Sequence, residues 1–140
     1  MPLFPLTARL FIALGAVLAA LSVALSAAAA HVPALQQAGP AFAASLDQHH
    51  FHALGLVLVG LAQTRRASGW FVAAGCLMVA GLLLFCLNIN ARILWGWDAA
   101  RALVPLGGSA FILAWLALAL GVLWPGQRPG FTPEAPANAR

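Results

Sequence analysis

The sequence contains very little charge. Charged residues make up 7% of its 140 residues, and neither lysine nor tyrosine occurs, whereas about 25% of the residues in an average soluble domain are charged. Hydrophobic residues account for 63% of the chain, and its mean hydropathy is +0.93. This composition excludes a water-soluble fold. Because the backbone must then satisfy its own hydrogen bonds inside lipid, we expect transmembrane helices and no soluble catalytic domain.

Acidic side chains are the scarcest charged group, and only Asp47, Asp98 and Glu134 are present. Asp47 falls at the start of the predicted second span, and none of the three lies in the middle of a predicted crossing, which argues against a proton pump or an ion-coupled carrier. The seven arginines are spread along the chain, so nucleic-acid binding is not expected. Absence of lysine beside abundant alanine, glycine, arginine and proline is typical of a GC-rich bacterial genome. We therefore expect a bacterial inner-membrane protein.

The apolar segments predict an all-α integral membrane four-helix bundle with up-down topology. The expected spans are residues 9–30, 46–63, 69–89 and 104–124, within a transmembrane domain of residues 1–124 that precedes a proline-rich cytoplasmic tail of residues 125–140. The first span also resembles a cleavable secretory signal. Because its apolar length is that of a full crossing, we expect it to be retained.

Polar residues predict where the spans begin and end. Ser45 and Gln48 have the spacing of a capping box, so a helix should start near Leu46. Ser68 can cap the third span. Asn88 and Asn90 are expected to mark the exit of that span, before an interfacial connection over residues 91–101.

Arginine and tryptophan predict the orientation. Near the ends of the spans, Arg9, Arg65, Arg66, Arg128 and Arg140 fall on one side, and Arg92 and Arg101 fall on the other. The first side carries more arginines, and by the positive-inside rule we expect it, with both termini, to be cytoplasmic. The expected interface anchors are Trp70 and Trp124 on the inner side and Trp95 and Trp97 on the outer side.

Small residues predict helix packing. The first span carries alanine at every fourth position, namely Ala16, Ala20, Ala24 and Ala28. Such a stripe allows another helix to approach closely. The fourth span opens with Pro105, Gly107 and Gly108, which favour close backbone packing or contact with an anionic headgroup. Cys76 and Cys86 are too far apart on one helix for a disulfide, and we expect both to be buried.

Histidines are the one concentration of chemically competent side chains. His49, His50 and His52 open the second span, and His31 closes the first. His49 and His52 share a helix face, whereas His50 points elsewhere. His31, His49 and His52 are therefore candidates for an outer-face transition-metal or haem site. The simpler interpretation is that these histidines face headgroups or bond to loop carbonyls, so no cofactor is expected.

Several segments together resemble a known family, the YgdD-like small inner-membrane proteins, grouped as domain of unknown function number four-two-three. The matching segments are Ala30-His31, Phe51-His52-Ala53-Leu54, Gly69-Trp70, and Pro105-Leu106-Gly107-Gly108 with Phe111 and Trp115. Val32, Val104 and Ala114 depart from the family pattern, which has Gly, Thr and Gly there. The resemblance implies a four-helix integral membrane protein and brings no established activity. Its two recurrent histidines correspond to His31 and His52.

The sequence therefore predicts a small multi-pass membrane protein without catalysis of its own. Its expected role is that of an accessory subunit, which packs against or stabilises a larger membrane complex. The expected partners are membrane lipids and other integral membrane subunits. Metal or haem binding is the alternative, and transport of a small solute or a lipid is a third hypothesis.

Overall fold

The computed structural model describes residues 5–124, and every regular element in this range is helical. In chain order these elements are α1 (Leu6–His31), α2 (Pro33–Gln36), α3 (Pro40–Arg65), α4 (Gly69–Gly81), the π-helix η1 (Leu82–Leu87), α5 (Asn88–Trp95), the 3-10 helix η2 (Arg101–Leu103) and α6 (Val104–Leu123). The described range holds no strand, which confirms the all-α prediction. The predicted tail of residues 125–140 lies outside the described residues.

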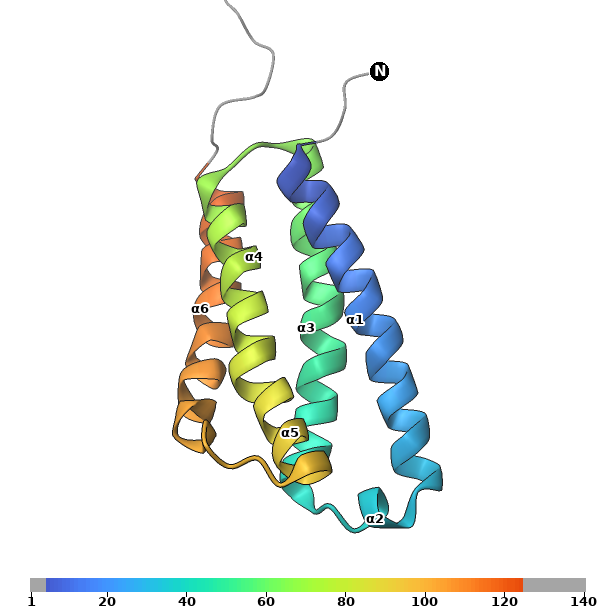
Figure 1. Cartoon of the computed structure of the whole chain (residues 1–140). Coiled ribbons are helices and arrows are strands. Elements are labelled where there is room, and N and C mark those ends of the chain that lie inside the picture. Colours follow the sequence, from blue (N-terminus) through green and yellow to red (C-terminus); the bar gives the residue numbers. More distant parts are fainter. Residues whose placement is uncertain (1–4, 125–140) are drawn as a thin grey trace, which may run out of the picture.

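The helices lie side by side as long rods, and successive rods run in opposite directions (Figure 1). α4, η1 and α5 follow one another without a break and form a single rod. α3 lies between α1 and this rod and packs against both, whereas α6 packs on the other side of α4 and η1. α3 contributes the buried polar residues Ser45, His49, His52 and Gln63.

Three helical segments are long and apolar enough to cross a membrane: Leu6–His31, Gly69–Trp95 and Arg101–Leu123. α3 has 26 residues, as many as α1. Its polar side chains make it less apolar than these three segments. Four of those side chains are buried against other helices and form a polar face, whereas Asp47 is exposed.

The predicted start of the second helix near Leu46 is wrong, because α3 begins six residues earlier, at Pro40. Gly39 precedes it with φ of +78°, a left-handed conformation that glycine adopts without steric cost. Pro40 occupies the first helical position, where its missing N–H is not needed. Ser45 is no cap, since its hydroxyl lies 3.0 Å from Asn90 Oδ1 and 3.2 Å from Cys86 O.

The third helix does not end at Ile89, the predicted exit of the span, because the helical rod continues to Trp95. Asn88 and Asn90 are buried within it instead of meeting water. Asn88 Nδ2 donates to the carbonyl of Ala100 and so ties the rod to the following connection. The helix ends at Gly96, whose φ of +68° is that of a left-handed C-terminal cap.

Glycines let the helices approach one another closely. A Cβ on Gly15 of α1 would lie 2.8 Å from Ala53 O of α3, and one on Gly60 of α3 would lie 2.9 Å from Ala8 O of α1. Elsewhere glycine makes room for aromatic rings, since Phe11 of α1 packs against Gly75 of α4. The prediction for the cysteines holds in part, because Cys86 is buried but Cys76 is exposed on the helix surface.

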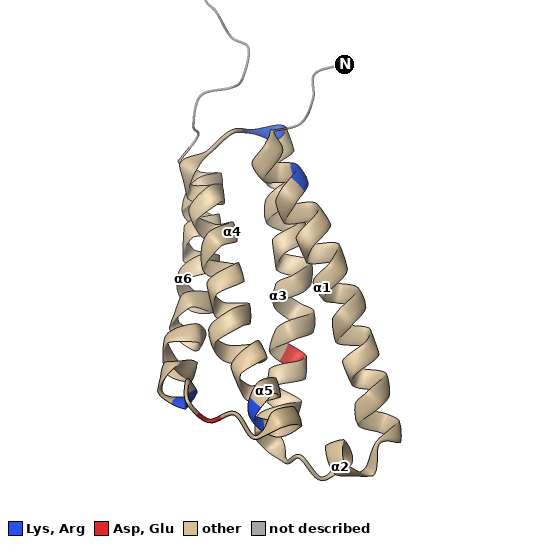
Figure 2. Ribbon diagram, in the orientation of Figure 1, with Lys and Arg blue, Asp and Glu red and all other residues tan. Residues whose placement is uncertain are grey.

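Among residues 5–124, the charged residues lie at the two ends of the bundle, apart from Asp47 in α3 (Figure 2). The described arginines are Arg9, Arg65 and Arg66 at the end where α1 begins, and Arg92 and Arg101 at the opposite end. At that opposite end, Arg92 Nε forms an ion pair with Asp98 Oδ1 at 2.8 Å. The end where α1 begins is therefore the more basic of the two.

Candidate functional site

The structure separates the four histidines. His31 is exposed at the end of α1, whereas His49 and His52 are buried and His50 is half-buried in α3. His50 Nδ1 bonds to the carbonyl of Leu46 on its own helix, at 2.8 Å. Among residues 5–124, no three His, Cys, Asp or Glu side chains come close enough together to hold a metal ion. The predicted set of His31, His49 and His52 is therefore not assembled in this conformation.

His52 sits in a fully satisfied aromatic cluster with Phe111 and Trp115 of α6. Its ring stacks on Phe111, with centroids 3.5 Å apart and planes 13° apart. Trp115 Nε1 donates to His52 Nε2 at 3.1 Å, and His52 Nδ1 lies 2.9 Å from the Gln48 carbonyl. Because an indole N–H can only donate, Nε2 must accept, and the proton must reside on Nδ1.

This tautomer determines what His52 can do. Each ring nitrogen is engaged, one by Trp115 and the other by Gln48. Metal binding at His52 would first require loss of the bond from Trp115. His52 with Phe111 and Trp115 thus joins α3 to α6, and it brings together residues from two separate segments that carry the family resemblance.

His49 is in the opposite situation. Its side chain is 4% exposed, and neither Nδ1 nor Nε2 has a hydrogen-bond partner in the described chain. It lines an apolar cavity of about 320 Å³, here called the His49 cavity. A buried polar group without a partner costs about 1–3 kcal/mol, so an unpaired imidazole at this depth requires an explanation.

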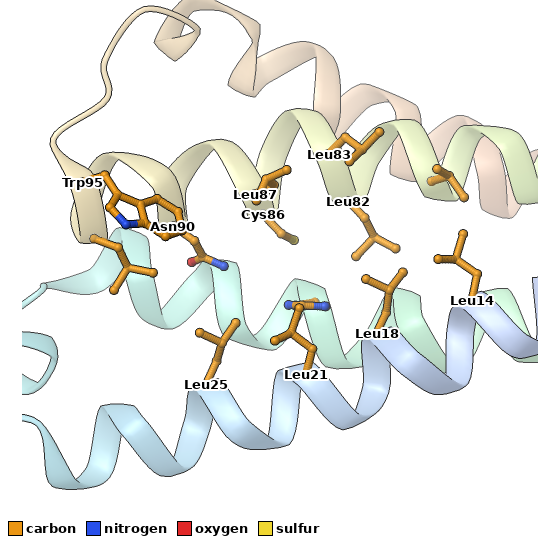
Figure 3. A pocket seen from close by; sticks show the side chains of 13 residues that line it. Leu14, Leu18, Leu21, Leu25, Leu82, Leu83, Cys86, Leu87, Asn90 and Trp95 are labelled. Carbon is orange, nitrogen blue, oxygen red and sulfur yellow. The ribbon is translucent and has the colours of Figure 1, made fainter.

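The walls of the His49 cavity come from α1 and from the rod of α4, η1 and α5 (Figure 3). Four leucines of α1, spaced alternately four and three residues apart, form one wall: Leu14, Leu18, Leu21 and Leu25. The opposite wall includes Leu82, Leu83, Cys86 and Leu87 of η1. Asn90 and Trp95 of α5 line the cavity towards the end of the rod. The cavity thus lies between two hydrocarbon walls with one histidine from α3.

The π-helix is the local feature that shapes this wall. π-Helical turns contain an extra residue, are rare, and occur frequently at functional sites. The Ser45 hydroxyl bonds to Asn90 and lies beside the Cys86 carbonyl, so α3 holds the irregular segment in place. Sequence reasoning missed the cavity. The alternating four- and three-residue spacing of leucines in the first span could have indicated a second packing face on that helix. No pattern in the sequence indicated the π-helix.

The other predicted site residues take varied positions. Ala16, Ala20 and Ala24 are exposed on α1 and Ala28 is half-buried, so the stripe faces away from the bundle. In α6, Pro105 lies in the first turn, and Gly107 packs so closely on η1 that a Cβ there would lie 2.6 Å from Phe85 N. Gly108 is less confined, with Phe85 Cδ2 at 3.9 Å from such a Cβ.

The four predicted interface tryptophans are all exposed and divide between the ends of the bundle. Trp70 opens α4 and Trp124 follows α6, both at the end where α1 begins. Trp95 closes α5 and Trp97 follows it, at the opposite end. Tryptophans that anchor a bundle at two membrane interfaces would be expected to divide in this way.

Comparison with known proteins places the chain among small membrane proteins. The family described as "Protein of unknown function (DUF423)" matches residues 25–108. The chain is 34% identical over 121 residues to the membrane protein YwdK of Bacillus subtilis, covering 82% of this chain and 97% of that relative. It is 26% identical over 126 residues to the inner membrane protein YgdD of Escherichia coli, covering 84% and 92% of the two chains. No solved structure matches it.

Proposed function

The chain belongs to the DUF423 family of membrane proteins, and on that premise we propose that it is a non-catalytic accessory subunit of a larger assembly in the bacterial inner membrane. It would pack against another integral membrane protein through α1. The observation that carries this proposal is the outward position of the alanine stripe, where Ala16, Ala20 and Ala24 are exposed on the helix surface.

We propose four crossings in up-down order, with α3 as the second. At 26 residues α3 measures about 39 Å, which is sufficient for a crossing. Its buried polar side chains do not oppose insertion, because they face protein. The alternating direction of the four rods and the two belts of exposed tryptophan support this topology.

We propose that both termini lie in the cytoplasm. Arg9, Arg65 and Arg66 lie at the end where α1 begins. At the other end Asp98 pairs with Arg92, which leaves Arg101 outside that ion pair. The more basic end would be cytoplasmic by the positive-inside rule.

The alanine stripe supports docking of another helix, because contact with lipid does not favour alanine over leucine. Association of helices in a membrane is driven by close van der Waals packing, and small residues permit it. The stripe occupies a face of α1 distinct from that of its buried residues, which are Ala8, Phe11, Gly15 and Ser22. An outward small-residue face therefore fits a further helix.

Purification in a mild detergent followed by native mass measurement tests the accessory role. We expect the wild-type chain to be recovered with an additional membrane protein, and Ala20→Phe to abolish that association. Ala119→Phe is the matched control, since Ala119 is an exposed alanine on α6. Recovery of the wild type only as a free monomer would contradict the proposal, and recovery only as a homo-oligomer would replace it with self-association.

The alternative function is an outer-face metal or haem site. His49 is the histidine with unpaired nitrogens and would be its first ligand. His52 would have to exchange its bond with Trp115, and His31 would have to approach from the end of α1. Metal analysis and an absorption spectrum of the purified protein test this alternative, with His52→Ala as the variant that must lose the signal.

A further inference from the structure

We propose that the His49 cavity binds an isoprenoid quinone from the membrane, with its ring carbonyls at His49 and Asn90 and its chain along the leucines of α1. The inference goes beyond the accessory role and does not rest on it. It uses a different face of α1 and a different set of residues.

The first step is the unpaired imidazole. A neutral histidine has one donor and one acceptor nitrogen, and both nitrogens of His49 lack a partner in the described chain although the side chain is 96% buried. His50, one residue away, bonds to the carbonyl of Leu46. His49 instead lines the cavity, where a ligand can supply the missing bond.

The second step is the shape of the cavity. Its α1 wall extends from Leu14 to Leu25, which corresponds to about 16 Å along a helix. Its volume of about 320 Å³ falls at the lower end of the range for small-molecule sites. Trp95, at the end of α5, lines it on the interface side. An elongated space with aliphatic walls suits a linear hydrocarbon chain.

The third step is the charge of the head group. No arginine, aspartate or glutamate lines the cavity. A phosphate or a carboxylate would therefore be buried without a counter-charge, which is strongly unfavourable. The occupant must be neutral, and this excludes phospholipid headgroups and ionised fatty acids.

The fourth step is the pair of polar groups. Asn90 lines the same cavity, and its Oδ1 already accepts from the Ser45 hydroxyl, so its Nδ2 is the donor that remains for a ligand. Asn90 projects into the space between the two walls (Figure 3). His49 provides a second donor. A quinone ring has two opposed carbonyl acceptors and a flat apolar body, so it can use two donors at once. A long-chain alcohol has a single oxygen.

Quenching of tryptophan fluorescence by a short-chain ubiquinone tests the proposal on the full chain in phosphatidylcholine nanodiscs. We expect saturable quenching in the wild type, most of which disappears in Trp95→Phe. His49→Leu should raise the dissociation constant about tenfold or more, because one buried hydrogen bond is lost. His50→Leu is the matched control, and its affinity should equal that of the wild type.

A second variant tests the proposal even if His49→Leu fails to fold. Leu21→Phe narrows the cavity at a half-exposed position and should also weaken binding, while circular dichroism shows its helix content unchanged. Non-saturating quenching in the wild type, or equal affinity of His49→Leu and His50→Leu, would overturn the proposal. Displacement of the quinone by an equal concentration of long-chain alcohol or diacylglycerol would overturn the assignment to quinone.

Discussion

At the scale of single residues, two histidines three positions apart on α3 are in opposite hydrogen-bonding states. His52 uses both nitrogens, through the Gln48 carbonyl and the Trp115 indole. His49 uses neither. Because both are buried, the first contributes to stability and the second costs stability. Mutation should therefore change the free energy of unfolding in opposite directions at the two positions.

His49→Leu should stabilise the protein after it has been stripped of bound lipophile. The substitution replaces an unpaired imidazole by an apolar side chain among leucines, so we expect a gain of about 1–3 kcal/mol in the free energy of unfolding. Thermal unfolding in mild detergent measures it, with His50→Leu as a control that shows no such gain. A clear loss of stability in His49→Leu would show that His49 has a partner in the folded protein.

Trp115→Phe should destabilise the protein. It removes the donor to His52 Nε2 and leaves a buried acceptor unpaired, at a cost of about 1–3 kcal/mol. Trp124→Phe is the matched control, because Trp124 is exposed at the end of α6. Unfolding curves of the two variants should differ clearly. Equal stability would contradict the assigned bond between Trp115 and His52.

The histidine cluster shows how far residue-level prediction from sequence reaches. Spacing alone identified His49 and His52 as neighbours on one helix and as the candidates for chemistry. It did not reveal that their faces meet different helices, since 60° of rotation is enough to move a side chain from α6 to the cavity beside α1. Partners such as Trp115, 63 residues away from His52, depend on tertiary packing.

At the scale of elements, the close contact of α1 with α3 depends on glycine. Gly15→Ala should cost about 1–3 kcal/mol, because the added Cβ would lie 2.8 Å from a backbone oxygen of α3 that cannot move independently. Gly108→Ala in α6 should be neutral or gain about 0.5–1 kcal/mol, since its nearest neighbour is 3.9 Å away. Unfolding measurements on the two variants check this. Equal effects would contradict the close approach of α1 and α3.

Helix type and approximate position could be predicted from apolar runs, whereas the boundaries depended on contacts that the runs do not show. α3 starts at Pro40 because a left-handed Gly39 and a proline at the first position define its start. The rod of α4 and α5 extends to Trp95 because Asn88 and Asn90 find partners inside the protein. Polar residues that indicate the end of a helix in the sequence can instead form buried hydrogen bonds in the middle of one.

At the scale of the whole molecule, the proposed topology depends on α3. Its hydropathy is lowered by a buried polar face, and the count of apolar helices alone gives three crossings. If α3 crosses, the connection between α3 and α4 lies in the cytoplasm, while the segment that contains α2 and the connection from α5 to α6 lie outside. If α3 does not cross, the connections at its two ends lie on the same side of the membrane.

Cysteine accessibility in intact cells tests this topology most directly. Cys76 and Cys86 are first replaced by alanine, and single cysteines are then introduced as Gln37→Cys, Ala67→Cys and Ala99→Cys. With a maleimide that does not cross the membrane, we predict labelling of the first and third variants in intact cells, and of Ala67→Cys only after permeabilisation. Labelling of Gln37→Cys and Ala67→Cys from the same side would contradict four crossings.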